Sequence, residues 1–82
     1  MDNHENQPRV IGLKQSVRAI LEGQAQLAIL ADDADEHIRK EVLDCCRKKN
    51  VPVETTESKA SLGKACGIER SAAVVAVLKP QQ

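Results

Sequence analysis

The hydrophobic positions along this chain of 82 residues alternate between two spacings. Apolar residues recur at helical spacing from about residue 13 to 22, and Gly23 follows them as a stop signal, which predicts a helix. Residues 27–31 form a short continuous apolar run, typical of a strand that is covered on both faces. Residues 9–12 add a short strand or a turn before the first helix.

An acidic segment, residues 32–36, separates this strand from a second helical pattern. One face of that pattern is apolar, and its residues are Ile38, Val42, Cys45 and Cys46. The acidic start and the basic end, residues 47–49, both suit a helix macrodipole. Residues 51–53 predict a brief strand, which Pro52 restricts to an edge of the sheet or to a strand start.

A third helix is predicted from Ser58, whose side chain is of the type that caps helix N-termini. Gly67 marks its C-terminal end. Its expected buried face consists of Leu62, Ala65 and Cys66. Residues 72–78 predict the last, central strand. The alternation of helices and strands indicates an α/β fold, a three-layer α/β/α sandwich with a small mixed sheet. We expect a single domain over residues 9–79, a flexible leader over 1–8 and a tail over 80–82.

The composition excludes two styles of nucleic-acid binding. The chain has no Phe, Tyr or Trp, so its core is aliphatic and it has no aromatic platform on which bases stack. Lys plus Arg and Asp plus Glu both total 12, so no net charge drives binding by bulk electrostatics.

Neither a metal site nor a catalytic motif is evident. The three cysteines, Cys45, Cys46 and Cys66, lack the spacing of metal ligands, and we interpret them as small buried residues in a reducing compartment. The acidic segment lacks the ligand pattern of a calcium loop, and we interpret it as a solvated loop that caps a helix. Phosphate-loop and nucleophile motifs are missing as well. We therefore expect a protein that is not an enzyme and needs no cofactor or metal.

No apolar run reaches the ~20 residues of a membrane span, and the first residues lack the order of a signal peptide. We expect a cytoplasmic protein without a membrane partner, and a monomer as the simplest state.

Two turns carry the most suggestive chemistry. Gly12 permits close backbone approach at the start of the first helix, where exposed amide N–H groups donate hydrogen bonds to phosphate oxygens. The second turn, residues 67–71, connects the third helix to the last strand. In a sandwich of this kind both turns can lie on one rim.

The first helix carries a basic face. Lys14 and Arg18 are four residues apart, so they share this face with Gln15. We expect Val17 and Leu21 to lie on the opposite face. Taken alone, a basic helix face is most often merely solvated.

At these residues the chain resembles the small bacterial members of the ribosomal protein L7Ae family, the kink-turn RNA binders. The resemblance rests on IGLKQSVR (residues 11–18) with Gly23 and on LGKACGI (residues 62–68), and it extends from about residue 10 to 78. It implies that the first helix enters the widened major groove of a kink-turn and reads the guanines of tandem sheared G·A pairs. It also implies that residues 68–72 cover the flipped-out nucleotides.

The family signature Gly-x-Asn-Glu-x-x-Lys aligns with Gly12, Lys14, Gln15 and Arg18. Lys replaces Asn and Gln replaces Glu, as is common in bacterial members. Lys donates to guanine O6 and N7, whereas Gln accepts more weakly than the charged Glu. The complete set of RNA-binding residues implied by the resemblance is Gly12, Leu13, Lys14, Gln15, Arg18, Lys59, Lys64, Ile68, Glu69, Arg70, Ser71 and Ala72.

We therefore expect a protein that recognises and stabilises kink-turns in structured RNA, either ribosomal RNA or an mRNA leader, in association with the ribosome. The basic residues Lys14, Arg18, Lys59, Lys64 and Arg70 are expected to gather on one rim, with residues 32–36 in a separate loop. The alternative is a protein-interaction domain of the same fold whose RNA binding is weak or lost, which the neutral charge and the two signature replacements favour.

Overall fold

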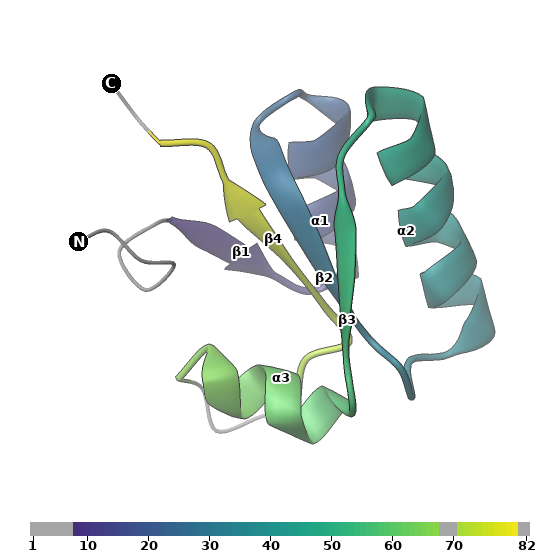
Figure 1. The fold of residues 1–82 in the computed structure, drawn as a ribbon, viewed down its shortest axis with the longest axis vertical. Helices are drawn as coiled ribbons and strands as arrows, with labels where there is room; N and C mark the ends of the chain where they lie inside the picture. The colour runs from purple at the N-terminus through teal and green to yellow at the C-terminus, as the bar shows by residue number, and fades with distance from the viewer. Residues whose placement is uncertain (1–7, 68–70, 81–82) are drawn as a thin grey trace.

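Strands and helices alternate along the chain in the computed structural model, which describes residues 8–67 and 71–80 (Figure 1). The elements in chain order are β1 (Arg9–Ile11), α1 (Leu13–Leu21), β2 (Ala25–Ala31), α2 (Glu36–Lys49), β3 (Val53–Thr56), α3 (Lys59–Ala65) and β4 (Val74–Leu78). Each predicted helix and strand is present, and residues 9–11 form the additional short strand.

The four strands form one mixed sheet in the order β1-β4-β2-β3. β4 lies between β1 and β2 and is antiparallel to both, whereas β2 and β3 are parallel. The Val-rich sequence of β4 suits this central place, since its first four residues are buried. The prediction of a central last strand is confirmed, as is the prediction of an edge position for the strand near Pro52.

The bounds of the edge strand differ from the prediction. β3 covers residues 53–56 instead of 51–53, and Val53 is the first residue paired with β2, opposite Ala28. The Pro52 carbonyl accepts a hydrogen bond from the Ala28 N–H at 3.0 Å, but proline itself has no N–H to donate. The polar residues that follow can form this strand because an edge strand is partly exposed to solvent and buries few side chains.

Helices cover both faces of the sheet, which confirms the three-layer sandwich. α1 and α2 pack side by side on one face, over a cluster that includes Val74 and Ala76. α3 covers part of the other face, where Leu62 packs with Val75 and Ala31. Successive residues of β4 therefore point to opposite layers, as the pleat of a strand requires.

Two apolar helix residues lie at the surface, and for Ala65 this contradicts the predicted buried face. Leu21 is 45 % exposed, because the inner face of α1 is centred on Ser16, Ala19 and Ile20. Ala65 is also exposed, whereas Leu62 is buried and Cys66, four residues later, is half-buried. No helix in residues 8–67 and 71–80 is long and apolar enough to cross a membrane.

Candidate nucleic-acid interface

Gly12 sets the start of α1. Its φ of 106° and ψ of 161° place it as the N-cap in a conformation that residues with a side chain rarely adopt. Its N–H donates to the Val74 carbonyl at 2.9 Å, and its carbonyl accepts from the Ser16 N–H at 3.0 Å. Since Gly12 has no side chain to cap the helix, the first-turn amides of α1 have no side-chain partner at this N-cap.

The segment before β4 is bonded to three other elements at the same end of the sheet. Besides the Gly12–Val74 bond, the Ala72 N–H donates to the Lys59 carbonyl at 3.0 Å, which joins the segment to the start of α3. The Ala31 N–H donates to the Ala73 carbonyl at 2.9 Å, which joins it to the end of β2. The start of α1, the start of α3 and residues 72–74 therefore lie together at one end of the sheet, which we call the rim.

The side chains of the predicted RNA-binding residues at this rim are mostly exposed. Lys14, Gln15, Lys64 and Ser71 are exposed, Leu13 and Lys59 are half-buried, and Ala72 is buried. Ile68, Glu69 and Arg70 lie outside the described residues. Backbone hydrogen bonds thus bring Gly12, Lys59 and Ala72 to one end of the sheet, whereas Gln15 and Arg18 line a groove with Gln24 and Leu78, which lie toward the other end.

Arg18 has an ionic partner that the sequence analysis did not consider. Its Nε donates to Oε2 of Glu22 at 3.2 Å, and the Arg18 side chain is 75 % exposed. Spacing of four residues on a helix is a sufficient signal for this pair. Because the pair is solvated, it is weak, and an anion can compete for the guanidinium.

The prediction that the apolar residues of α1 lie opposite its basic face is wrong. Lys14 and Arg18 line one groove together with Val17 and Leu21. Leu21 is seven residues after Lys14, almost two full turns, so the two side chains lie on nearly the same face. The basic face of α1 therefore has an apolar flank.

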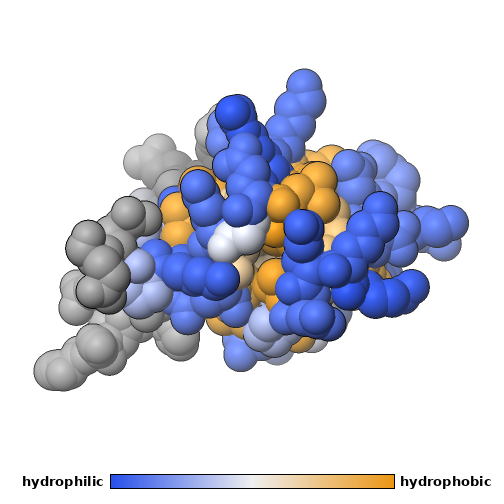
Figure 2. Space-filling model, turned by 90° about the horizontal axis from the view of Figure 1, so that it is seen from above, coloured by the Kyte–Doolittle hydropathy of each residue, from blue (hydrophilic) through white to orange (hydrophobic). Residues whose placement is uncertain are grey.

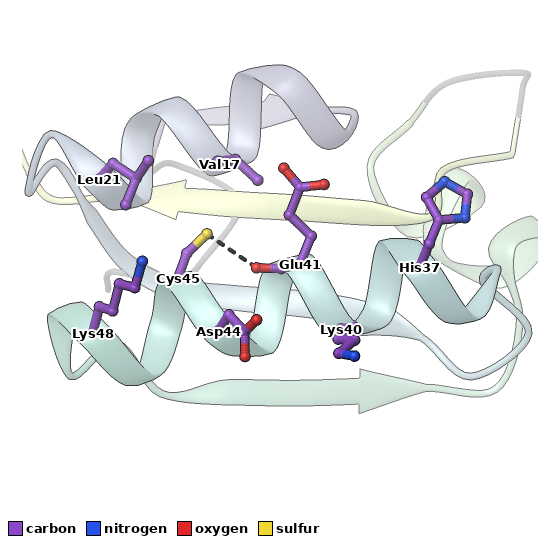
Figure 3. Close-up of a pocket in the computed structure, with 8 residues that line it drawn as sticks. All are labelled: Val17, Leu21, His37, Lys40, Glu41, Asp44, Cys45 and Lys48. Carbon is purple, nitrogen blue, oxygen red and sulfur yellow. Dashed lines mark hydrogen bonds between the residues drawn. The ribbon is translucent and has the colours of Figure 1, made fainter.

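This flank faces α2 across an adjoining groove of about 400 Å³ (Figure 3). Val17 and Leu21 point toward α2, and the Glu41 side chain reaches from α2 toward α1. The Cys45 Sγ donates to the Glu41 carbonyl at 3.1 Å. Burial raises the pKa of the Cys45 thiol, and the nearby Glu41 charge raises it further. Such a thiol is a packing group at neutral pH and not a nucleophile.

The acidic segment is not separate from this rim. An Asp33 carboxylate oxygen accepts from the Lys59 N–H at 2.8 Å, and the Asp32 N–H donates to the Thr56 carbonyl at 2.8 Å. Residues 32–35 do form a separate loop between β2 and α2, but this loop lies beside the rim, because β2 ends at the same edge at which β4 begins. The segment does cap a helix, but it is α3 that the Asp33 side chain caps, whereas Asp35, at the start of α2, makes no side-chain cap.

Within residues 8–67 and 71–80, no three His, Cys, Asp or Glu side chains are arranged to hold a metal ion. The chemistry that the described rim offers is hydrogen-bond donation: helix amides, lysine ammonium groups, a guanidinium and a glutamine amide. These groups suit an anionic partner with polar edges.

Comparison with known proteins agrees with this fold. Residues 3–82 match the ribosomal protein L7Ae/L30e/S12e/Gadd45 family, and the chain belongs to this family. It is 47% identical over 70 residues to RNA-binding protein YbxF of Geobacillus stearothermophilus, and this match covers 85% of each chain. It is 37% identical over 70 residues to an RNA-binding protein of Staphylococcus aureus, which covers 85% of this chain and 83% of the other.

Solved structures of similar fold include one described as a 15.5 kD RNA-binding protein from Giardia lamblia. Its TM-score is 0.81 at 30% identity, and the match covers 87% of this chain and 60% of that one. A Bacillus halodurans protein of unknown function matches with a TM-score of 0.81 at 34% identity, over 87% of this chain and 71% of that one.

Proposed function

We propose that this protein binds structured RNA and holds a kink-turn in its bent form. The observation that carries the proposal is the joining of the two motifs, since the Gly12–Val74 and Ala72–Lys59 backbone bonds hold the start of α1 and the segment before β4 at one end of the sheet. The relatives described as RNA-binding proteins support the RNA partner.

In this proposal the start of α1 reads the RNA. Lys14 donates to O6 and N7 of a guanine, and Gln15 pairs with a neighbouring base edge. Arg18 contacts a backbone phosphate after exchanging its Glu22 partner, and the first-turn amides of α1 donate hydrogen bonds to a further phosphate oxygen. Lys59 and Lys64 contact the backbone beside residues 68–72, which cover the flipped-out nucleotides. Ribosomal RNA and mRNA leaders are the structured RNAs we propose as natural targets.

The proposed mechanism needs no chemical step. A kink-turn exists as an equilibrium of extended and bent forms, and a protein that contacts only the bent form shifts the equilibrium by its differential affinity. Recognition therefore depends on the shape of the RNA and on a few base edges. A protein can recognise both without aromatic residues and without a net positive charge.

The test is a titration without magnesium, at fixed salt, of a kink-turn RNA and of the same RNA with its G·A pairs replaced. We expect Lys14→Ala and Gln15→Ala each to weaken kink-turn binding by ~1–3 kcal/mol, the range of one good base-edge contact. Arg18→Ala is expected to reduce mainly the salt dependence. Lys40→Ala, an exposed change on α2, is the control and should bind normally.

Equal affinity of the wild-type protein for both RNAs would refute specific recognition of the kink-turn. Absence of RNA binding altogether would favour the protein-interaction alternative, for which the acidic segment at this rim and the apolar flank of α1 provide a surface.

A further inference from the structure

A second cationic site lies at the end of the molecule opposite the start of α1. A hollow of about 250 Å³ opens there between the end of α2 and the residue that follows β4. Lys49 and Lys79 line it together with Asn50 and Gln26, and no described carboxylate lines it. Figure 2 looks onto this end, where polar side chains project around a smaller apolar surface.

The backbone of Lys79 is fixed by an irregularity in the sheet. The register between β2 and β4 shifts between Ala25 and Leu27, as at a β-bulge, so Gln26 is left out of the ladder. Its side-chain amide donates to the Leu78 carbonyl at 2.8 Å, and the Lys79 N–H donates to the Gln24 carbonyl at 2.8 Å. The bulge thereby anchors Lys79 at the edge of the hollow.

Lys49 is placed by the end of α2. Asn50 adopts a left-handed conformation with φ 57°, and the following Val51 N–H donates to the Cys46 carbonyl at 2.9 Å. This cap turns the chain toward β3 and leaves Lys49 on the wall of the hollow. Two segments 30 positions apart in the sequence therefore present one lysine each to the same space.

Among the residues that the structure describes, no carboxylate neutralises the two lysines. Both are exposed, and neither makes an ion pair within the described part of the chain. Arg47 and Lys48 add to the positive charge of this end. The dipole of α2 favours a cation in its last turn and so accounts for Lys49. It does not account for Lys79, which follows β4.

We propose that this hollow binds a phosphate group of the RNA backbone, as a second contact remote from the rim that reads the kink-turn. Lysine is a flexible point charge suited to phosphate. β4 spans five residues, so the two contacts are ~17 Å apart. Contacts this far apart fall on phosphates that are several nucleotides apart along the RNA. The RNA partner itself rests on the function proposed above.

The test compares the salt dependence of RNA binding by two double variants that lose equal charge. Lys49→Gln with Lys79→Gln removes the hollow's cations, and Arg39→Gln with Lys40→Gln removes two exposed cations from the first half of α2. We expect the slope of log affinity against log salt to fall by about one to two in the first variant only. An unchanged slope there, or an equal fall in both variants, overturns the proposal.

Failure of the kink-turn proposal gives a different result. A phosphate contact carries no sequence information, so the slope change should be the same for the kink-turn RNA and for the RNA with replaced G·A pairs. If the wild-type protein binds both RNAs equally, kink-turn recognition fails while this slope change still supports the phosphate contact.

Inorganic phosphate distinguishes the source of the anion. We expect it to shift the amide NMR signals of Asn50 and Lys79 in the wild-type protein but not in the variant lacking both lysines. Phosphate shifts together with an unchanged RNA salt slope would identify a site for a free anion and overturn the assignment to the RNA backbone.

Discussion

At the residue scale, Gly12 shows why a glycine is required where the RNA-binding helix is proposed to begin. A Cβ built on Gly12 meets no atom within 4 Å, so space does not require a glycine in the protein itself. The requirement is conformational, because φ 106° with ψ 161° lies in a region that is essentially restricted to glycine. The same conformation leads β1 into α1 and allows the bond to Val74.

Gly12→Ala is expected to lower the free energy of unfolding by ~1–3 kcal/mol, the cost of holding an alanine in this region. Urea denaturation measures the change. Lys14→Ala, two residues further on and exposed, is the matched control and should stay within ~0.5 kcal/mol. Equal midpoints for the Gly12→Ala protein and the wild type would contradict the conformational explanation.

Because of Cys46, we expect the free energy of unfolding to fall in alkaline solution. Burial raises the pKa of its thiol from the ordinary 9.0 to about 11, and the neighbouring Cys45 contributes. Between these pH values the unfolded chain releases the proton and the folded protein keeps it, so the free energy of unfolding falls as pH rises. Cys46→Ala should show a shallower fall from pH 9 to 11 than Cys66→Ala, measured by thermal unfolding. If the stability of the two variants falls equally with pH, the Cys46 thiol is not the cause of the alkaline destabilisation.

At the element scale, α3 is a helix of seven residues whose start is held by two caps. The Ser58 Oγ accepts from the Ser61 N–H at 3.0 Å, which confirms the predicted N-cap. The Asp33 carboxylate accepts from the Lys59 N–H at 2.8 Å. So short a helix is marginal by itself, and these bonds supplement the burial of Leu62. α3 in turn holds the segment before β4 through the Lys59 carbonyl.

Loss of either cap is expected to destabilise the protein. Ser58→Ala should cost ~1 kcal/mol, the usual value for a helix N-cap. Asp33→Ala should cost a similar ~1 kcal/mol for a charged acceptor, and the double variant should show non-additivity because both caps serve one helix end. Chemical denaturation of the four proteins tests this. Ser71→Ala is the exposed control, and strict additivity would contradict a shared role.

At the scale of the whole molecule, zero net charge conceals an uneven distribution. Acidic residues 32–36 follow β2 and lie at the rim that we propose reads RNA, whereas residues 47–49 and Lys79 lie at the other end. The lysines of the rim therefore lie close to the carboxylates of this acidic segment. Recognition there depends on the geometry of individual donors more than on a positive field.

Asp32→Asn tests this arrangement. The Asp32 side chain is exposed, so the change should leave stability nearly unaltered while removing a charge that repels the RNA. We expect RNA affinity to increase about two- to fivefold at low salt and the gain to vanish as salt screens the charge. Glu54→Gln, an exposed change on β3, is the control. Unchanged affinity at low salt for the Asp32→Asn protein would contradict a repulsive acidic segment.

The sequence by itself determined the elements and their layers. Helical spacing and continuous apolar runs are local patterns, and they correctly predicted the three helices, the central β4 and the Ser58 cap. The two motifs of the L7Ae family predicted the RNA-binding residues, which stay a prediction. The exposure of Leu21 could not be predicted, because apolar spacing alone does not show where the inner face of a helix is centred.

Only the tertiary structure decided which distant segments meet. Asp33 caps a helix 26 residues away, the acidic segment lies at the rim and not apart from it, and Lys49 shares a hollow with Lys79. These contacts follow from the strand order β1-β4-β2-β3 and from a bulge at Gln26. A local hydrophobic pattern shows which strands are central and which lie at an edge, but the choice of partner strand and the position of a bulge depend on the packing of the whole chain.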